Sequence, residues 1–97
     1  MTDEMPELTK ADFARAIRHS TRERLIGGKL LGGADVAALR RFVAMSQTEF
    51  SGALGISVYT LRNWEQDRRT PRGPALALLR IAARHPRVLR ENLVATA

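Results

Sequence analysis

The stretch "LGISVYTLRNWEQDRRTP", residues 54–71, combines side chains that can read nucleic-acid bases with a run of arginines. An asparagine amide can bond the edge of adenine, and valine or threonine methyl groups can pack on the methyl group of thymine. Arginine can bond guanine or hold a phosphate, while Tyr59 stays open between a groove contact and an ordinary surface position. The predicted base-reading residues are Val58, Tyr59, Thr60, Arg62 and Asn63.

A second set of side chains is suited to the phosphate backbone of DNA, where contacts give affinity and position without sequence information. One member, Gln47, begins a predicted helix, and the free N–H groups of a helix start also favour phosphate. The predicted phosphate-binding residues are Gln47, Ser57, Arg68, Arg69 and Arg72.

These side chains need two short helices that meet at a tight turn. Ser46 and Glu49 have the spacing of a capping box, which predicts a helix that starts directly after Ser46. Gly55 suits the left-handed residue that ends this helix, and Ser57 can cap the next helix, over residues 58–66. The residues expected to point inward are Phe50, Leu54, Ile56, Leu61 and Trp64. This pattern predicts a helix-turn-helix unit, and the alternative is a generic helical bundle that turns at Gly55.

The other helical signals indicate an all-α fold. The predicted helices outside the unit cover residues 36–44, 75–84 and 87–94. Asp35 can cap the first of them, and Pro74 and Pro86 can open the other two. Glu65 is expected to hold a neighbouring arginine or a helix end rather than to read a base. Four arginines at helical spacing are expected to form a solvated face: Arg80, Arg84, Arg87 and Arg90. No strand alternation longer than a few residues is present, so the sequence predicts five short helices.

The amino-terminal third has a different organisation. Residues 8–25 are predicted to form one helix that Thr9 caps, but its apolar stripe is too thin to form a core alone. The following "IGGKLLGG", residues 26–33, has the composition of a hinge. We therefore expect an amino-terminal segment, 1–34, that docks on another surface, and a DNA-binding domain, 35–97.

Composition limits the classes of protein to consider. The chain has 97 residues, no cysteine and a formal net charge of +6. Residues 35–97 carry ten basic residues, all arginine, and five acidic ones, so a polyanionic partner is plausible. The chain lacks a signal peptide and a membrane-spanning run, which predicts a soluble cytoplasmic protein without membrane contact. No residues have the spacing of a metal site, a cofactor site or a catalytic set, so we expect no metal, no cofactor and no enzyme activity.

The segment "MSQTEFSGALGISVYTLRNWEQDRRTPRGPALALLRIAARHP" resembles the Xre/Cro-type helix-turn-helix regulators. More narrowly, it is similar to the HigA-type antitoxins of type II toxin–antitoxin systems, and the likeness runs over roughly residues 35–94. Members of that family often have the sequence "NWEQG", so Asp67 stands here in place of a glycine. This departure concerns the local turn and not the fold.

The resemblance implies a five-helix, lambda-repressor-like domain that binds a palindromic operator as a homodimer and represses its own operon. It also implies an amino-terminal segment, helical or partly disordered, that neutralises an mRNA-cleaving toxin of the RelE/HigB kind. The residues expected to bind this toxin are Leu8, Phe13, Ile17 and Leu25. Two alternatives remain: a stand-alone repressor without a toxin partner, whose amino-terminal helix docks on its own body or serves dimerisation, and a protein-interaction module that has lost DNA binding.

Overall fold

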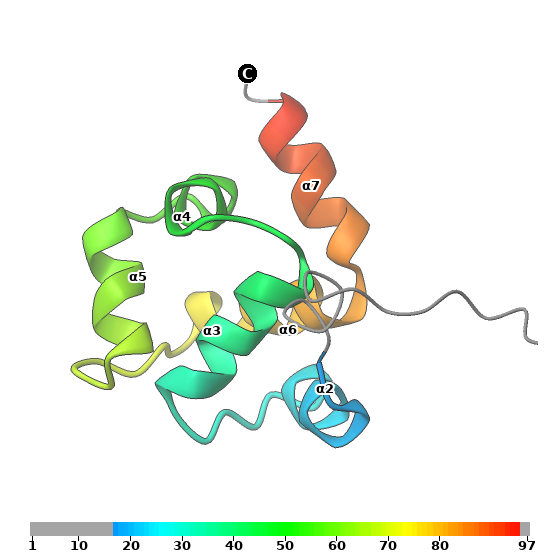
Figure 1. Ribbon diagram of the computed structural model, residues 1–97, viewed down its shortest axis with the longest axis vertical. Coiled ribbons are helices and arrows are strands. Elements are labelled where there is room, and N and C mark those ends of the chain that lie inside the picture. Colours follow the sequence, from blue (N-terminus) through cyan, green and yellow to red (C-terminus); the bar gives the residue numbers. More distant parts are fainter. Residues whose placement is uncertain (1–16, 96–97) are drawn as a thin grey trace, which may run out of the picture.

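The computed structural model describes residues 17–95, with the side chains of residues 17–92. Every regular element in this part of the chain is a helix, as predicted (Figure 1). The helices are α2 (His19–Ile26), α3 (Gly33–Phe42), α4 (Gln47–Leu54), α5 (Val58–Glu65), α6 (Pro74–Arg84) and α7 (Pro86–Ala95). In Figure 1, α3 and α6 lie in the middle of the body, and α5 and α7 lie on opposite sides of it.

Local signals determine where α4 and α5 begin. The Ser46 hydroxyl accepts a hydrogen bond from the N–H of Glu49 at 3.1 Å, and the Glu49 carboxylate accepts one from the N–H of Ser46 at 2.9 Å. The predicted capping box is therefore present. Gly55 ends α4 in the left-handed region with φ 75°, and Ser57 caps α5 by accepting from the N–H of Thr60. The helix-turn-helix unit is confirmed at both of its helix starts and at its turn.

A single hydrophobic core joins all six of these helices. Phe50, Leu39, Leu61 and Leu79 are fully buried and come from four different helices. Burying one such side chain contributes about 1.5–3 kcal/mol. Trp64 is also buried, as predicted, and it packs as part of this core.

The start of α3 corrects one prediction. The helix begins at Gly33 with no side-chain cap, so Asp35 lies in its first turn instead of capping it. The Asp35 carboxylate binds the guanidinium of Arg24 and accepts from the N–H of Leu31. Asp35 therefore ties the segment before α3 to α2.

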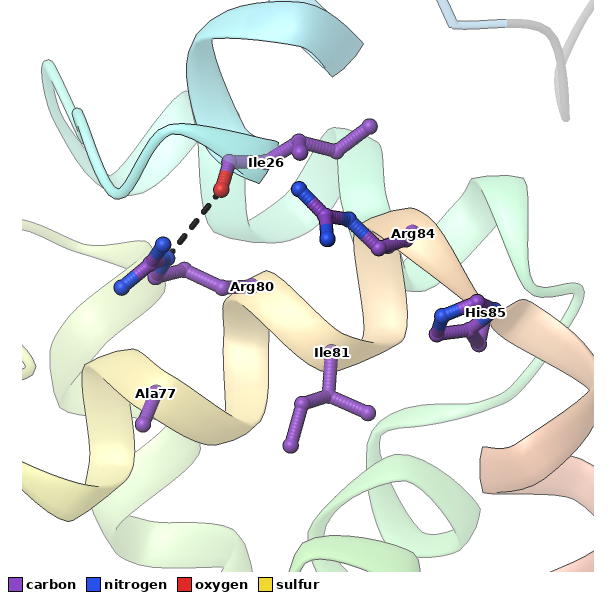
Figure 2. A pocket seen from close by; sticks show the side chains of 6 residues that line it. All are labelled: Ile26, Ala77, Arg80, Ile81, Arg84 and His85. Atoms are coloured by element: carbon purple, nitrogen blue, oxygen red, sulfur yellow. Dashed lines mark hydrogen bonds between the residues drawn. The ribbon is translucent and has the colours of Figure 1, made fainter.

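The segment predicted as a hinge, residues 26–33, is packed on the body in this structure. Gly33 is buried, and its N–H donates to the Asp67 carboxylate at 2.7 Å. The preceding α2 packs against α6, where the Arg80 guanidinium donates to the carbonyl of Ile26 at 3.1 Å (Figure 2). Leu25 of α2 is only 2% exposed and belongs to the core. Residues 17–34 are therefore part of the same body as residues 35–92.

Arg22 makes a second attachment of α2. Its guanidinium donates to the carbonyl of Ala83 at 2.9 Å and stacks 5.5 Å from the centre of the Phe42 ring. Arg22 thus bridges α2 to both α3 and α6. These contacts fix α2 on the body.

The helix predicted over residues 8–25 is confirmed only for its last part, because α2 begins at His19. Ile17 and Arg18 are not helical, and Arg18 has an extended backbone with φ −64° and ψ 140°. The helix begins at His19, and apolar spacing alone contains no signal for such a break. The proposed cap at Thr9 lies outside the described residues.

None of the helices in the described ranges is long and apolar enough to cross a membrane.

Candidate nucleic-acid interface

The α4–α5 unit presents α5 on the outside of the body. Leu61 and Trp64 anchor α5 inward, and Phe50 anchors α4. Ser51 is 3% exposed where the two helices approach, and its hydroxyl donates to the carbonyl of Thr48. A small residue at this position lets the helices meet closely.

A network of four polar side chains locks α3, α4 and α5 together. Arg40 of α3 donates to both carboxylate oxygens of Glu65, at 2.7 and 3.3 Å. The Gln47 amide nitrogen donates to Glu65 at 3.1 Å, and its amide oxygen accepts from Arg62 Nε at 3.2 Å. The side chains of Glu65 and Arg40 are only 9% and 17% exposed. The prediction that Glu65 holds a neighbouring arginine is confirmed.

This network also determines which donor and acceptor atoms of Gln47 and Arg62 remain for a ligand. Gln47 has both ends of its amide engaged within the protein, so its side chain is oriented by Glu65 and Arg62. Arg62 donates to Gln47 through Nε. Arg62 is exposed, and its two terminal nitrogens take no part in this bond. A guanidinium held in this way can bond phosphate or a base edge with little loss of side-chain entropy.

The predicted base-reading residues differ in how they are presented. Tyr59 is 68% exposed and Arg62 is exposed, whereas Val58 and Thr60 are half-buried at the start of α5. The Thr60 hydroxyl lies 3.0 Å from the hydroxyl of Ser57, so these two side chains support the helix start as well. These four residues share the first two turns of α5.

Asn63 corrects the prediction that all five readers point outward. Helical spacing places Asn63 near Tyr59, yet Asn63 is only 6% exposed. The chain after α5 folds back over this turn, and the N–H groups of Arg68 and Arg69 both donate to the Asn63 carbonyl, at 2.8 and 3.3 Å. In the described conformation Asn63 is a buried residue at the end of α5 and not an open reader.

The loop between α5 and α6 carries three exposed arginines, Arg68, Arg69 and Arg72. Its conformation is defined by Asp67, which adopts a left-handed backbone with φ 62°, and by the buried Pro71. The arginines therefore project from a loop with a defined path, next to the end of α5. This placement is compatible with their predicted phosphate contacts.

Sequence reasoning did not identify the contact between Asp67 and Gly33. Asp67 takes the left-handed turn for which the related sequences use glycine, and its carboxylate also accepts from the N–H of Gly33. Aspartate is one of the residues that tolerate the left-handed region, so the sequence was compatible with this turn. The contact of Asp67 with Gly33, 34 residues away, had no signal in the sequence.

The predicted toxin-binding residues fall into two groups. Leu8 and Phe13 lie outside the described residues. Ile17 is half-buried and packs against the core, and Leu25 is buried within it. Leu25 is not available to another protein while α2 keeps this position, so the predicted toxin contact of Leu25 does not fit the described conformation.

A curated relative, Antitoxin HigA-2 of Vibrio cholerae serotype O1, is 40% identical over 55 residues, which cover 57% of this chain. The match covers 53% of the relative's length, so this chain spans about half of it. No protein-family model matches the chain, and no solved structure matches it. The relative supports the resemblance to HigA-type antitoxins that the sequence motifs indicated.

Proposed function

We propose that this chain is a DNA-binding regulator that reads an operator with α5 and also acts as an antitoxin. The observation that carries the first part is the presentation of α5. Its exposed side holds Tyr59 and Arg62, it is fixed by the Arg40–Glu65–Gln47–Arg62 network, and it adjoins three exposed arginines. Together these features match the surface and charge that a major groove requires.

In this proposal α5 enters the major groove and its first two turns face the bases. Tyr59 and Val58 contact base edges or thymine methyl groups, and Arg62 bonds guanine or an adjacent phosphate. The arginines of the loop between α5 and α6 and the start of α4 bind the flanking phosphates. One helix of eight residues reads only a half-site, so the operator is bound by two copies spaced by about one helical turn, ~34 Å.

The test is binding to the DNA upstream of the gene that encodes this chain. We expect tighter binding to that fragment than to a scrambled fragment of the same length, measured by fluorescence anisotropy. Affinity for both fragments should fall steeply between low and moderate salt, because phosphate contacts release counterions. Equal affinity for the two fragments, or affinity that is independent of salt, would contradict operator reading.

The antitoxin role rests on the similarity to Antitoxin HigA-2 and on the segment before Ile17. Residues 1–16 contain four acidic side chains, Asp3, Glu4, Glu7 and Asp12, and two basic ones, which suits a basic RNA-cleaving partner of the RelE/HigB kind. Growth after co-expression with the product of a neighbouring toxin gene tests this part. A reporter fused to the upstream DNA tests autorepression in the same cells.

A further inference from the structure

A pocket with basic and aliphatic side chains lies between the end of α2 and α6 (Figure 2). It has a volume of about 280 Å³. Its lining residues are Ile26, Ala77, Arg80, Ile81, Arg84 and His85. Two guanidinium groups thus share one hollow with three aliphatic side chains, a combination that suits a ligand with carboxylates next to apolar groups. None of the predicted base-reading or phosphate-binding residues lines this pocket.

Arg80 is held by two contacts with the segment at the end of α2. Its Nε donates to the carbonyl of Ile26 at 3.1 Å, and a Cβ added at Gly28 would lie 3.1 Å from its Cδ. The two terminal nitrogens of Arg80 take no part in the bond to Ile26. In Figure 2, Arg80 and Arg84 both point from α6 toward α2. A carboxylate that reaches this pair therefore meets donors of which one is already held in place, so little side-chain entropy is lost.

No acidic side chain of residues 17–92 lines this pocket. The ion pairs within this part of the chain are His19–Glu23, Arg24–Asp35 and Arg40–Glu65. Arg80 and Arg84 belong to none of these pairs, and they stand four residues apart on α6, where like charges repel. An anionic group placed between the two guanidinium groups removes this repulsion.

We propose that residues 1–16 of this chain dock in the pocket and place acidic side chains at Arg80 and Arg84. Residues 1–16 carry four acidic and two basic side chains, whereas residues 17–97 carry six acidic and fourteen basic ones. The two parts of the chain therefore attract each other.

The sequence of this segment also matches the mixed lining of the pocket. In "ELTKADF", residues 7–13, a carboxylate directly precedes a large apolar side chain twice, as Glu7–Leu8 and Asp12–Phe13. Either pair can bring a carboxylate to the guanidinium groups and an apolar side chain to the aliphatic wall. Ile81 of this wall also lines the neighbouring groove between α6 and α7, so the variants below leave it unchanged.

The segment joins the body close to the pocket. Arg22, in the first turn of α2, donates to the carbonyls of Ala83 at 2.9 Å and of Arg84 at 3.4 Å, so the start of α2 lies near the end of α6. An extended chain covers about 3.3–3.6 Å per residue, so Asp12 can lie up to about 17 Å from Ile17. The whole of α2 is only about 12 Å long. Residues 1–16 can therefore reach the pocket while α2 keeps its position.

Covalent attachment favours this segment over a separate acidic peptide. A tethered ligand acts at an effective concentration in the millimolar range, so contacts that are individually weak are sufficient. The docking itself does not rest on the proposed function. Where that function holds, a toxin that binds residues 1–16 competes with the pocket for them.

Paramagnetic NMR on the full chain tests the docking. The chain has no cysteine, so Thr9→Cys provides a single attachment site for a nitroxide label. We expect the label to broaden the amide signals of Arg80 and Ile81 more than those of Val58 and Tyr59 on α5. The broadening at the pocket should weaken as salt is added, because exposed ion pairs are screened.

Two variants place a carboxylate in the pocket, Arg84→Glu and Ala77→Glu. Each should lose most of the broadening at the pocket, since the added charge repels the acidic segment. The matched controls are Arg68→Glu and Ala34→Glu, which make the same changes at an exposed arginine and an exposed alanine outside the pocket. Both controls should keep the broadening of the parent chain.

The outcomes separate this proposal from its alternatives. Broadening that survives in both pocket variants, or equal broadening at the pocket and on α5, overturns the docking. Loss of broadening in Arg68→Glu instead of the pocket variants places the segment on the loop after α5 and overturns it as well. Circular dichroism verifies the fold of each variant, and the two pocket variants are independent, so unfolding of one leaves the other as the test.

Operator titrations and growth assays on the same full chain test the proposed function separately. Docking without operator binding or protection from a toxin supports this proposal and contradicts the proposed function. Operator binding and protection in a chain that shows no broadening at the pocket contradict the docking alone.

Discussion

Gly33 lies against the end of α5, where its backbone approaches that of Trp64 and Glu65 and its N–H donates to the Asp67 side chain. The N–H of Gly33 meets the Asp67 carboxylate, and a Cβ at position 33 would lie 2.3 Å from the carbonyl oxygen of Glu65 and 2.4 Å from that of Trp64. Both of these carbonyls belong to the last turn of α5. Glycine is required at this position for close approach, and its φ is not the reason.

Gly33→Ala should therefore destabilise the fold by about 1–3 kcal/mol, since the obstructing atoms are backbone and cannot rotate away. Gly52→Ala is the matched control. An added Cβ there meets nothing within 4 Å, and alanine favours the helix, so this variant should gain about 0.5–1 kcal/mol. Urea unfolding of the two variants measures both effects. A Gly33→Ala variant as stable as the parent would contradict the close approach.

The orientation of α5 depends on contacts among three helices. Arg40 from α3 and Gln47 from α4 converge on Glu65 at the end of α5, and the chain of bonds ends at Arg62. The first of these contacts is largely buried, so the dielectric around it is low and its loss leaves an unpaired charge. The helix α5, which reads DNA in our proposal, is thereby connected to α3, which does not face the DNA there.

Glu65→Ala should cost about 3 kcal/mol of stability, because it leaves the Arg40 guanidinium without its buried partner. Glu23→Ala removes the same charge from an exposed position on α2 and should change stability by less than about 0.5 kcal/mol. The double variant Arg40→Ala, Glu65→Ala should cost less than the sum of the two single variants. Additive costs in thermal unfolding would mean that the two side chains act independently.

Tyr59→Ala and Arg69→Ala should affect DNA binding in different ways. If Tyr59 contacts a base, its loss should cost about 1–3 kcal/mol on the operator and little on scrambled DNA. Loss of Arg69 should weaken binding to both and lower the slope of log affinity against log salt by about 1. Anisotropy titrations at several salt concentrations measure both quantities. Unchanged operator affinity in Tyr59→Ala would assign that residue to the ordinary surface.

For the whole molecule, the body begins before residue 34. Leu25 is in the core, Arg22 bonds α6, and the segment after α2 reaches the end of α5 through Gly33. Within residues 1–34, the proposed toxin contacts therefore have to lie before Ile17 or on the exposed surface of residues 17–34. A truncation that tests toxin binding separately from DNA binding should therefore end before Ile17.

Deleting residues 1–16 should leave stability and operator affinity close to those of the full chain and abolish protection from the toxin. Deleting residues 1–30 should also remove a buried leucine and destabilise the body by about 2–5 kcal/mol. Unfolding curves, operator titrations and growth assays on the two truncations distinguish these outcomes. If cells remain protected by the chain that lacks residues 1–16, the toxin-binding assignment is wrong.

The sequence by itself determined the helix-turn-helix unit and the two helices that follow it, α6 and α7. Capping by Ser46 and Ser57, the left-handed stop at Gly55 and the inward position of Trp64 act within one or two turns, so their signals are local. The exposed Tyr59 and the loop arginines were located for the same reason. These parts of the candidate site follow from signals that lie within a few residues of one another along the chain.

Only the tertiary structure decided what packs against the end of α5 and where α2 docks. Asn63 is buried because the following loop returns over α5, and the supposed hinge is ordered because Gly33 meets Asp67, 34 residues away. The docking of α2 depends on Arg22 and Ala83, which are 61 residues apart. Contacts at such separations depend on how the helices pack in three dimensions, and a periodic pattern within one helix carries no information about its distant partner.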